Sequence, residues 1–450
     1  MRGLAAEGGI RIRGITLRVG HTPSLSRWRG PLPLPRGARE KKPLHFQLPR
    51  TGKRGKREGP ARRTLTVDAR LDQTAFNMTD FADRALLPAG LRDILPPQAE
   101  HEADVIVRLM SCFAGEGYER VKPPLIEFEE SLLEGSGAAM AKHTFRVMDP
   151  VTQRMMGVRA DMTLQVARIA TTRLLNAPRP LRLSYAGQVL RVKGGQLRPE
   201  RQFAQAGIEL IGASSAAADA EVVVSSARAL LELGLTDITV DLGLPTLIPL
   251  IIGDNGEGLR DALDHKDVAT VAAIGGPAAA TLVALIEAVG PAASALTKLA
   301  TLDLPPAAAA ERQRLAEVVQ LISRAEPDLT LTVDPVENRG FEYHTGIAFT
   351  IFTRHSSSEL GRGGRYSAHG ETATGATLFL DTVLDVLPGP QPLRRVFLPL
   401  GTPYTVRRRL RGEGWVTVAG LDPVSDAAVE ARRLACGHLW QGDKIIAAGQ

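Results

Sequence analysis

The sequence has little cysteine, few aromatic residues and no long apolar run. Its two cysteines, Cys112 and Cys436, form no CxxC motif and belong to no Cys/His cluster, which argues against a structural zinc and favours a reducing compartment. No run of about eighteen or more apolar residues occurs, so we expect no membrane span, no membrane partner and a cytoplasmic location. A chain of 450 residues is expected to form two or three domains.

Residues 185–212 predict two antiparallel strands joined by a polar loop that contains glycine and proline. Gln205 and Glu209 are four residues apart on the second strand, so their side chains leave the same face. Gly207 between them lets a ligand approach the backbone closely. An amide and a carboxylate on one face suit an ammonium or imidazole group. The alternative, a solvated Glu209, is equally compatible with the spacing.

The same stretch resembles motif 2 of the class II aminoacyl-tRNA synthetases, in the form carried by histidyl-tRNA synthetases. In that family the glutamate two residues after the motif arginine holds the adenine of ATP, and Lys193 stands there in this chain. The resemblance therefore covers the amino-acid side of the motif and not the adenine contact. The matching residues are Arg191, Arg201, Phe203, Gln205, Gly207 and Glu209.

Residues 88–128 predict a turn-rich opening, a helix over 98–114 and a strand broken by Pro123 and Pro124. The two prolines favour an edge position for that strand. The segment resembles the opening and motif 1 of histidyl-tRNA synthetases, where the helix and the strand form a dimer interface. A homodimer is therefore implied. The opening is matched by Pro88, Gly90, Asp93, Leu95 and Pro96.

Residues 143–175 predict a hairpin followed by a helix that begins at Thr163. Asp161 lies just before that helix, where a carboxylate satisfies free backbone N–H groups, and a cap is its simplest role. In histidyl-tRNA synthetases a glutamate at this position contacts the amino group of bound histidine. The resemblance gives Asp161 that role, with a side chain one methylene shorter.

Two strands are predicted within residues 329–353, joined by the connector Arg339 to Gly346. The connector can be an ordinary hairpin loop. It also resembles the histidine-specific signature Arg-Gly-Leu-Asp-Tyr-Tyr-x-Gly, with Glu342 for Asp and His344 for the second Tyr. The second family signature, Gly-Gly-Arg-Tyr-Asp, is matched up to its last residue by Gly363, Gly364, Arg365 and Tyr366, with Ser367 in place of Asp.

Together these residues predict a pocket for a small zwitterion. Acidic and amide groups suit an ammonium and an imidazole N–H, Arg191 or Arg339 suits a carboxylate, and Tyr343 would line the imidazole. The resemblance identifies the ligand as L-histidine, acting as a regulatory effector. No catalytic residue, metal site or cofactor is predicted. The predicted histidine-binding residues are Asp161, Arg191, Gln205, Glu209, Arg339, Tyr343 and His344.

The contacts to ATP are the part of the family pattern that is missing. Motif 3 of histidyl-tRNA synthetases ends in a Glu-Arg pair whose arginine holds the phosphates, and Asp381 and Thr382 stand there. With Lys193 also changed, adenylation is not expected. Residues 394–450 predict strands and helices, including an arginine-rich helix that favours a solvated surface, but they are short for an anticodon-binding domain.

A synthetase-like core without these parts resembles the regulatory subunits of ATP phosphoribosyltransferase. That family implies a non-catalytic chain that activates a short-form catalytic subunit and mediates histidine feedback in the first step of histidine biosynthesis. The implied assembly is a hetero-octamer that contains a homodimer of this chain, with no nucleic acid bound. The alternatives are a divergent histidyl-tRNA synthetase and a tRNA-binding adaptor.

The fold expected is α+β, a class II synthetase-like antiparallel sheet flanked by helices. We expect a core over 78–388 with an alanine-rich helical insertion at about 246–328, and a small α/β segment over 389–450. Residues 1–77 hold 18 Lys/Arg against 5 Asp/Glu, whereas the rest holds 37 against 44. We expect this basic head to be disordered and to lie outside the functional protein, which would start at Met78. A nucleic-acid-binding arm and a targeting leader are the alternatives.

Overall fold

The computed structural model describes residues 86–133, 140–194, 199–253, 257–337 and 343–449. The predictions for the basic head and for Arg339 lie outside these residues. None of the described helices is long and apolar enough to cross a membrane.

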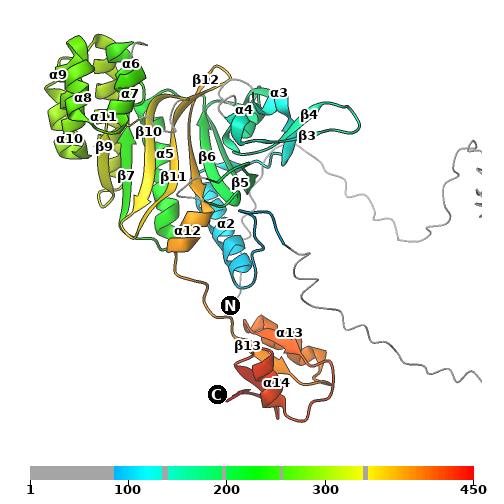
Figure 1. Ribbon diagram of the computed structural model, residues 1–450. Coiled ribbons are helices and arrows are strands. Elements are labelled where there is room, and N and C mark those ends of the chain that lie inside the picture. The colour runs from blue at the N-terminus through cyan, green and yellow to red at the C-terminus, as the bar shows by residue number, and fades with distance from the viewer. Residues whose placement is uncertain (1–85, 134–139, 195–198, 254–256, 338–342, 450) are drawn as a thin grey trace, which may run out of the picture. The chain divides into compact units, whose positions relative to one another are not determined.

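A nine-stranded sheet forms the centre of the described core (Figure 1). Its middle strands pair antiparallel, whereas β1 with β5 and β7 with β9 pair parallel. The confirmed class is therefore α+β with a largely antiparallel sheet. In spatial order the strands are β1 (Glu119–Arg120), β5 (Leu181–Leu190), β6 (Gln202–Ile211), β12 (Glu371–Phe379), β11 (Ser356–Ala368), β10 (His344–Thr353), β7 (Ile238–Gly243), β9 (Thr330–Asp334) and β8 (Gly290–Pro291).

The hairpin predicted over 185–212 is β5 and β6, which pair along their full length from Leu181 opposite Ile211 to Leu190 opposite Gln202. Successive side chains of β6 point to opposite faces of the sheet. Ile208 and its alternate neighbours join the large apolar core, and the intervening residues join a second, smaller core. The sheet is therefore buried on both faces, and one face carries the polar residues.

Two predicted helices cover the apolar face. Helix α2 (Gln98–Gly115) packs on β1, β5 and β6, and α5 (Ala216–Glu232) packs across β6 and β10 to β12. Their buried residues, such as Val105 and Leu230, belong to the large core. Helix α12 (Leu380–Val386) directly follows β12 and contacts β6 and β11.

Pro123 and Pro124 separate two strands that join different sheets. β1 precedes them at the edge of the large sheet, as predicted, whereas the strand after them pairs with the 143–175 hairpin. Helix α4 packs on β5, β6 and β11 and covers part of the polar face. The elements of this region are β2 (Ile126–Phe128), α3 (Glu129–Leu132), β3 (Phe145–Met148), β4 (Met155–Val158) and α4 (Thr163–Thr172).

Apart from the two-residue strand β8, the chain between β7 and β9 is mainly helical in its described part, as the alanine-rich composition predicts. Figure 1 shows these helices gathered at the β7 end of the sheet. Helix α11 packs on α5, and α10 packs on β9, so their apolar residues extend the large core. The elements are α6 (Leu247–Ile252), α7 (Glu257–Asp264), α8 (Val268–Ile274), η2 (Gly276–Ala278), α9 (Ala279–Glu287), α10 (Ala292–Ala300) and α11 (Pro306–Ala325).

The C-terminal segment has a four-stranded sheet of its own, in the order β14-β13-β15-β16. β13 pairs parallel with β14 and β15, and β15 forms a hairpin with β16, so the segment is α/β as predicted. Its elements are β13 (Arg395–Leu398), α13 (Tyr404–Gly412), β14 (Val416–Ala419), α14 (Ala427–Arg433), β15 (His438–Gln441) and β16 (Lys444–Ala447).

Candidate functional site

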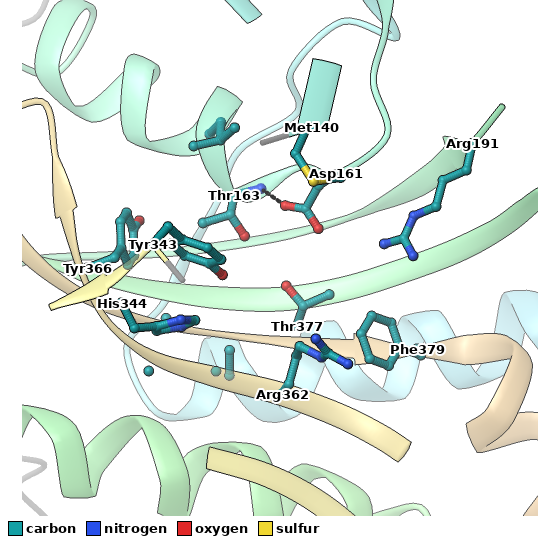
Figure 2. Close-up of a pocket in the computed structure, with 15 residues that line it drawn as sticks. Met140, Asp161, Thr163, Arg191, Tyr343, His344, Arg362, Tyr366, Thr377 and Phe379 are labelled. Atoms are coloured by element: carbon teal, nitrogen blue, oxygen red, sulfur yellow. Dashed lines mark hydrogen bonds between the residues drawn. The ribbon is translucent and has the colours of Figure 1, made fainter. Parts of the chain in front are cut away.

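A cavity of about 170 Å³ opens on the polar face of the large sheet, beside the start of α4 (Figure 2). Strands β10, β11 and β12 form its floor, and the loop before α4 and the end of the β5-β6 hairpin form its sides. Segments distant in sequence therefore meet at one site. The lining residues are Met140, Asp161, Thr163, Leu164, Arg191, Tyr343, His344, Arg362, Gly363, Gly364, Tyr366, Gly375, Ala376, Thr377 and Phe379.

Strand register explains why these side chains meet. β12 lies beside β6 with Gly207 opposite Thr377 and Glu209 opposite Gly375. On its other side β12 pairs with β11, where Arg362 lies opposite Thr377. Because residues directly opposite each other share a face, these groups lie in adjacent rows on the polar face.

Glycine makes room for the large side chains in these rows. A Cβ atom at Gly207 would lie 2.4 Å from the Tyr185 hydroxyl oxygen. A Cβ at Gly375 would lie 1.7 Å from Oε2 of Glu209. Both positions therefore exclude any larger residue while the neighbouring side chain keeps its place.

Glu209 is fully buried beneath the cavity and is not solvated. The Tyr366 hydroxyl donates to its Oε2 at 2.9 Å, and the Tyr185 hydroxyl donates to its Oε1 at 3.2 Å. The pKa of Glu209 is raised to about 8, chiefly by burial and in part by the negative charge of Asp161, while the hydrogen bonds to the carboxyl group oppose the rise. The carboxyl group is therefore mostly protonated at pH 7.

The two tyrosines belong to one hydrogen-bonded network. The Tyr185 hydroxyl lies 2.8 Å from Oγ1 of Thr377 and 3.2 Å from Oγ1 of Thr163. Burial raises the pKa of both Tyr185 and Tyr366 well above its ordinary value, and the nearby Glu209 adds to the rise. Both phenols therefore stay protonated and act as fixed donors around Glu209.

Asp161 accepts a hydrogen bond from a backbone N–H at the start of α4, although Met162 is the N-cap residue, and it also lines the cavity. Its Oδ1 accepts from the Thr163 backbone N–H at 2.8 Å, at the start of α4, and Figure 2 marks this bond. Its Oδ2 accepts from Nε2 of Gln205 at 3.1 Å. The Oε1 atom of Gln205 is buried and has no hydrogen-bond partner among the described residues. Gln205 therefore presents an acceptor atom beside a carboxylate, a combination that suits an ammonium or N–H group.

An aromatic wall closes the end of the cavity near β10. The Tyr343 and His344 rings lie 4.1 Å apart between centroids, and Tyr343 meets Tyr366 edge-on at 6.4 Å. His344 is buried, whereas Tyr343 is 36% exposed. A planar ligand group can therefore lie against Tyr343 from the open side of the cavity.

Two guanidinium groups mark the opposite end. The Arg191 guanidinium carbon lies 5.1 Å from the Phe203 ring centroid, and that of Arg362 lies 6.0 Å from the Phe379 centroid. Figure 2 shows both arginines on the Phe379 side of the cavity, away from Tyr366. The Phe379 end of the cavity therefore carries two positively charged groups.

Comparison with known proteins identifies the family. Residues 90–383 match the family model described as histidyl-tRNA synthetase. The chain is 64% identical to an ATP phosphoribosyltransferase regulatory subunit of Paramagnetospirillum magneticum over 376 residues, which cover 82% of this chain and 99% of the relative. It is 61% identical to the regulatory subunit of Rhodospirillum centenum, with 80% and 96% covered. The chain belongs to the ATP phosphoribosyltransferase regulatory subunit family.

Solved structures agree on the fold. The ATP phosphoribosyltransferase regulatory subunit/histidyl-tRNA synthetase of Bacillus halodurans has a TM-score of 0.68 at 22% identity, covering 78% of this chain and 96% of that chain. Histidyl-tRNA synthetase of Nostoc sp. PCC 7120 has a TM-score of 0.63 at 16% identity, with 79% and 90% covered. At these identities the likeness shows the fold alone. The class II synthetase-like fold predicted from the sequence is confirmed.

The two positions at which an ATP-contacting residue of the synthetases is replaced, Thr382 and Lys193, lie outside the cavity lining. Thr382 is buried in the first turn of α12, and its hydroxyl donates to the backbone carbonyls of Glu359 at 2.7 Å and Phe379 at 3.0 Å. Lys193 is exposed and does not line the cavity. Among the described residues, no group of three or more His, Cys, Asp or Glu side chains is placed to hold a metal ion.

Six of the seven predicted binding residues are described, and all six lie in or directly beneath the cavity. Asp161, Arg191, Tyr343 and His344 line it. Gln205 and Glu209 lie beneath it and contact lining residues. The seventh, Arg339, lies outside the described residues.

Sequence reasoning missed several residues of this site as binding candidates. Tyr366 belongs to a matched signature, and Thr163 lies two residues after Asp161 at the predicted helix start, so both could have been included on those signals. Tyr185, Arg362 and Thr377 reach the site only through strand register, which the sequence pattern does not indicate.

Proposed function

We propose that this chain is the non-catalytic regulatory subunit of an ATP phosphoribosyltransferase. It activates a separate short-form catalytic subunit and carries histidine feedback in the first step of histidine biosynthesis. The observation that carries the proposal is a cavity lined by residues that match the histidine contacts of a synthetase, in a chain that has Thr382 in place of the phosphate-binding arginine. The membership of the regulatory subunit family supports the same assignment.

The non-catalytic part of the proposal rests on Thr382 and Lys193. A synthetase stabilises the charge that develops on the ATP phosphates with a fixed cation, and removing one such group costs about a hundredfold or more in rate. Thr382 has no positive charge, and its hydroxyl already donates to two backbone carbonyls. We therefore propose that the chain does not adenylate histidine.

The proposed pose of histidine follows the charges of the cavity. The ammonium group lies against Asp161 and Gln205, because the Gln205 amide donates to Oδ2 of Asp161 at 3.1 Å and its Oε1 atom has no hydrogen-bond partner among the described residues. The imidazole lies against Tyr343 and faces the network around Glu209. The carboxylate points toward Arg191, and Arg339 and His344 complete the proposed set.

The oligomeric state is also a proposal. We propose a homodimer of this chain within a hetero-octamer that contains the catalytic subunit and no nucleic acid. Apolar side chains on the predicted dimer segments support it, since Val107 of α2 is 61% exposed and Leu125, after the two prolines, is 48% exposed. Burying such residues against a second copy would be favourable.

The test is phosphoribosyl-ATP formation by a cognate short-form catalytic subunit, with and without the full chain. The proposal predicts a higher rate with the chain present and no phosphoribosyl-ATP from the chain alone. A matched assay measures histidine-dependent exchange between ATP and pyrophosphate by the chain alone. Exchange at a synthetase-like rate would support the divergent synthetase instead, and a failure to stimulate the catalytic subunit would reject the regulatory assignment.

A further inference from the structure

Arg362 is a cavity residue to which neither the family signatures nor the sequence prediction gives a role. Side chains of β11 alternate between the faces of the sheet. Arg365 points toward α5, where it pairs with Asp219 at 2.7 Å and is buried. Arg362 and Tyr366 lie on the other face and line the cavity. Arg362 therefore brings a positive charge into the site.

Neighbouring groups hold the Arg362 guanidinium in place. Its Nε donates to Oε2 of Glu359 at 3.1 Å, and its Nη2 donates to the same oxygen. The backbone carbonyl of Glu359 accepts from the hydroxyl of Thr382. Thr382, which stands where a synthetase carries its phosphate-binding arginine, thus helps to fix the residue that orients Arg362.

Arg191 approaches the same end from the hairpin side. Its Nε donates to the Ala160 carbonyl at 3.4 Å, and it lies over the Phe203 ring. Phe203 and Phe379 pack edge to face at 6.3 Å, and Arg362 lies over Phe379. Each of the two packed phenylalanine rings therefore has one guanidinium group over it, that of Arg191 on Phe203 and that of Arg362 on Phe379.

We infer that Arg362, together with Arg191, forms an oxyanion-binding subsite that takes a carboxylate or a phosphate. The Glu359 carboxylate offsets part of the Arg362 charge, and an anion that contacts both guanidinium groups would add charge-assisted hydrogen bonds at this end of the cavity. Guanidinium groups suit such ligands because their planar donors match carboxylate and phosphate oxygens. The positive charge that is absent at Thr382 is thus supplied from the neighbouring strand.

This inference adds a ligand-binding residue to the site of the proposed function. The histidine titrations in its test rest on that proposed function. If the oxyanion is the carboxylate of histidine, Arg362 is a specificity residue for the effector. If it is a phosphate group, the cavity takes a phosphorylated ligand at this end. A carboxylate subsite and a phosphate subsite are told apart by the ligand, histidine or pyrophosphate, that binds less tightly when Arg362 is changed.

The test is calorimetric titration of the full chain with L-histidine, with histamine, which lacks the carboxylate, and with inorganic pyrophosphate. The variants are Arg362→Gln, Arg362→Lys and the double variant Glu359→Gln with Arg362→Gln, which leaves the net charge unchanged. The control is Arg354→Gln, because Arg354 is exposed in the turn before β11 and does not line the cavity. Far-ultraviolet circular dichroism checks that each variant folds.

A carboxylate subsite predicts that Arg362→Gln and the double variant weaken histidine binding about tenfold or more, and leave histamine binding unchanged. A phosphate subsite predicts the same loss for pyrophosphate with histidine unaffected. In either case Arg362→Lys loses less affinity than Arg362→Gln, and Arg354→Gln matches the wild type. Equal affinities of wild type and Arg362→Gln for both anions, or an equal loss in Arg354→Gln, would overturn the inference.

The outcomes separate the inference from the proposed function. A wild-type chain that binds pyrophosphate through Arg362 but does not bind histidine supports the subsite and counts against the effector role. A wild-type chain that binds histidine with an affinity unchanged by Arg362→Gln, and does not bind pyrophosphate, supports the effector role and rejects the subsite. A chain that binds neither ligand rejects both.

Discussion

Replacing Glu209 by glutamine should change how the stability of the protein depends on pH. Burial holds the pKa of Glu209 at about 8 in the folded chain, above the ordinary value of 4.5. The folded state therefore binds more protons than the unfolded state between these two values. Glu209 stabilises the fold fully only below about pH 4.5, and that stabilisation is lost as the pH rises toward 8.

The size of the effect follows from linkage. One proton bound only by the folded state lowers the free energy of unfolding by up to about 1.4 kcal/mol for each pH unit of increase within the window. Glutamine cannot ionise, so Glu209→Gln removes this slope. The free energy of unfolding of the variant, minus that of the wild type, should therefore rise with pH between about 5 and 8 and level off above 8.

The assay is urea denaturation of both proteins at half-unit pH steps from 5 to 8.5. Glu371→Gln is the matched control, because its hydrogen bonds with Arg179 lower the pKa of Glu371 below its ordinary value. Stability due to Glu371 is present above that ordinary value and is lost only on acidification, so its variant should differ from wild type by a constant amount over this range. Equal pH slopes for wild type and Glu209→Gln would refute the account of Glu209 as a buried, protonated acid.

Three further substitutions test the site and its support. Asp161→Asn keeps an oxygen for the helix start but removes the charge, so histidine affinity measured by calorimetry should fall about tenfold or more. Gly375→Ala places a methyl group where the Glu209 carboxylate lies, so it should displace that side chain, weaken histidine binding and cost about 1–3 kcal/mol in urea denaturation. Arg365→Met leaves Asp219 buried without its main partner and should cost about 3 kcal/mol. A variant with the histidine affinity and stability of the wild type would contradict the role given to the residue that it changes.

The elements around the site were predictable because their sequence patterns are strong. The period of two in β5, β6 and β10 and the helical spacing in α2 placed those elements close to their observed bounds. Pro123 and Pro124 predict an edge strand, and β1, which precedes them, lies at the edge of the large sheet. The periodic spacing of apolar residues and the missing backbone N–H of proline act on neighbouring residues only, so both can be recognised in a single sequence.

The surroundings of Glu209 could not be predicted in the same way. Its exposure was undecided from spacing, because burial depends on Tyr185 and Tyr366, which lie 24 and 157 residues away in sequence. Arg362 reaches the cavity only because β11 and β12 pair with Arg362 opposite Thr377. Register of this kind is a property of the assembled sheet, and a one-residue slip would turn Arg362 to the opposite face.

The central claim is that this cavity is the histidine sensor of a regulatory subunit. The most direct measurement is the rate of phosphoribosyl-ATP formation by a cognate catalytic subunit across a histidine titration, with the wild-type chain and with the Asp161→Asn, Glu209→Gln double variant. The account predicts stimulation by both proteins and suppression by histidine only with the wild type. Absence of stimulation, or equal sensitivity of the double variant to histidine, would contradict it.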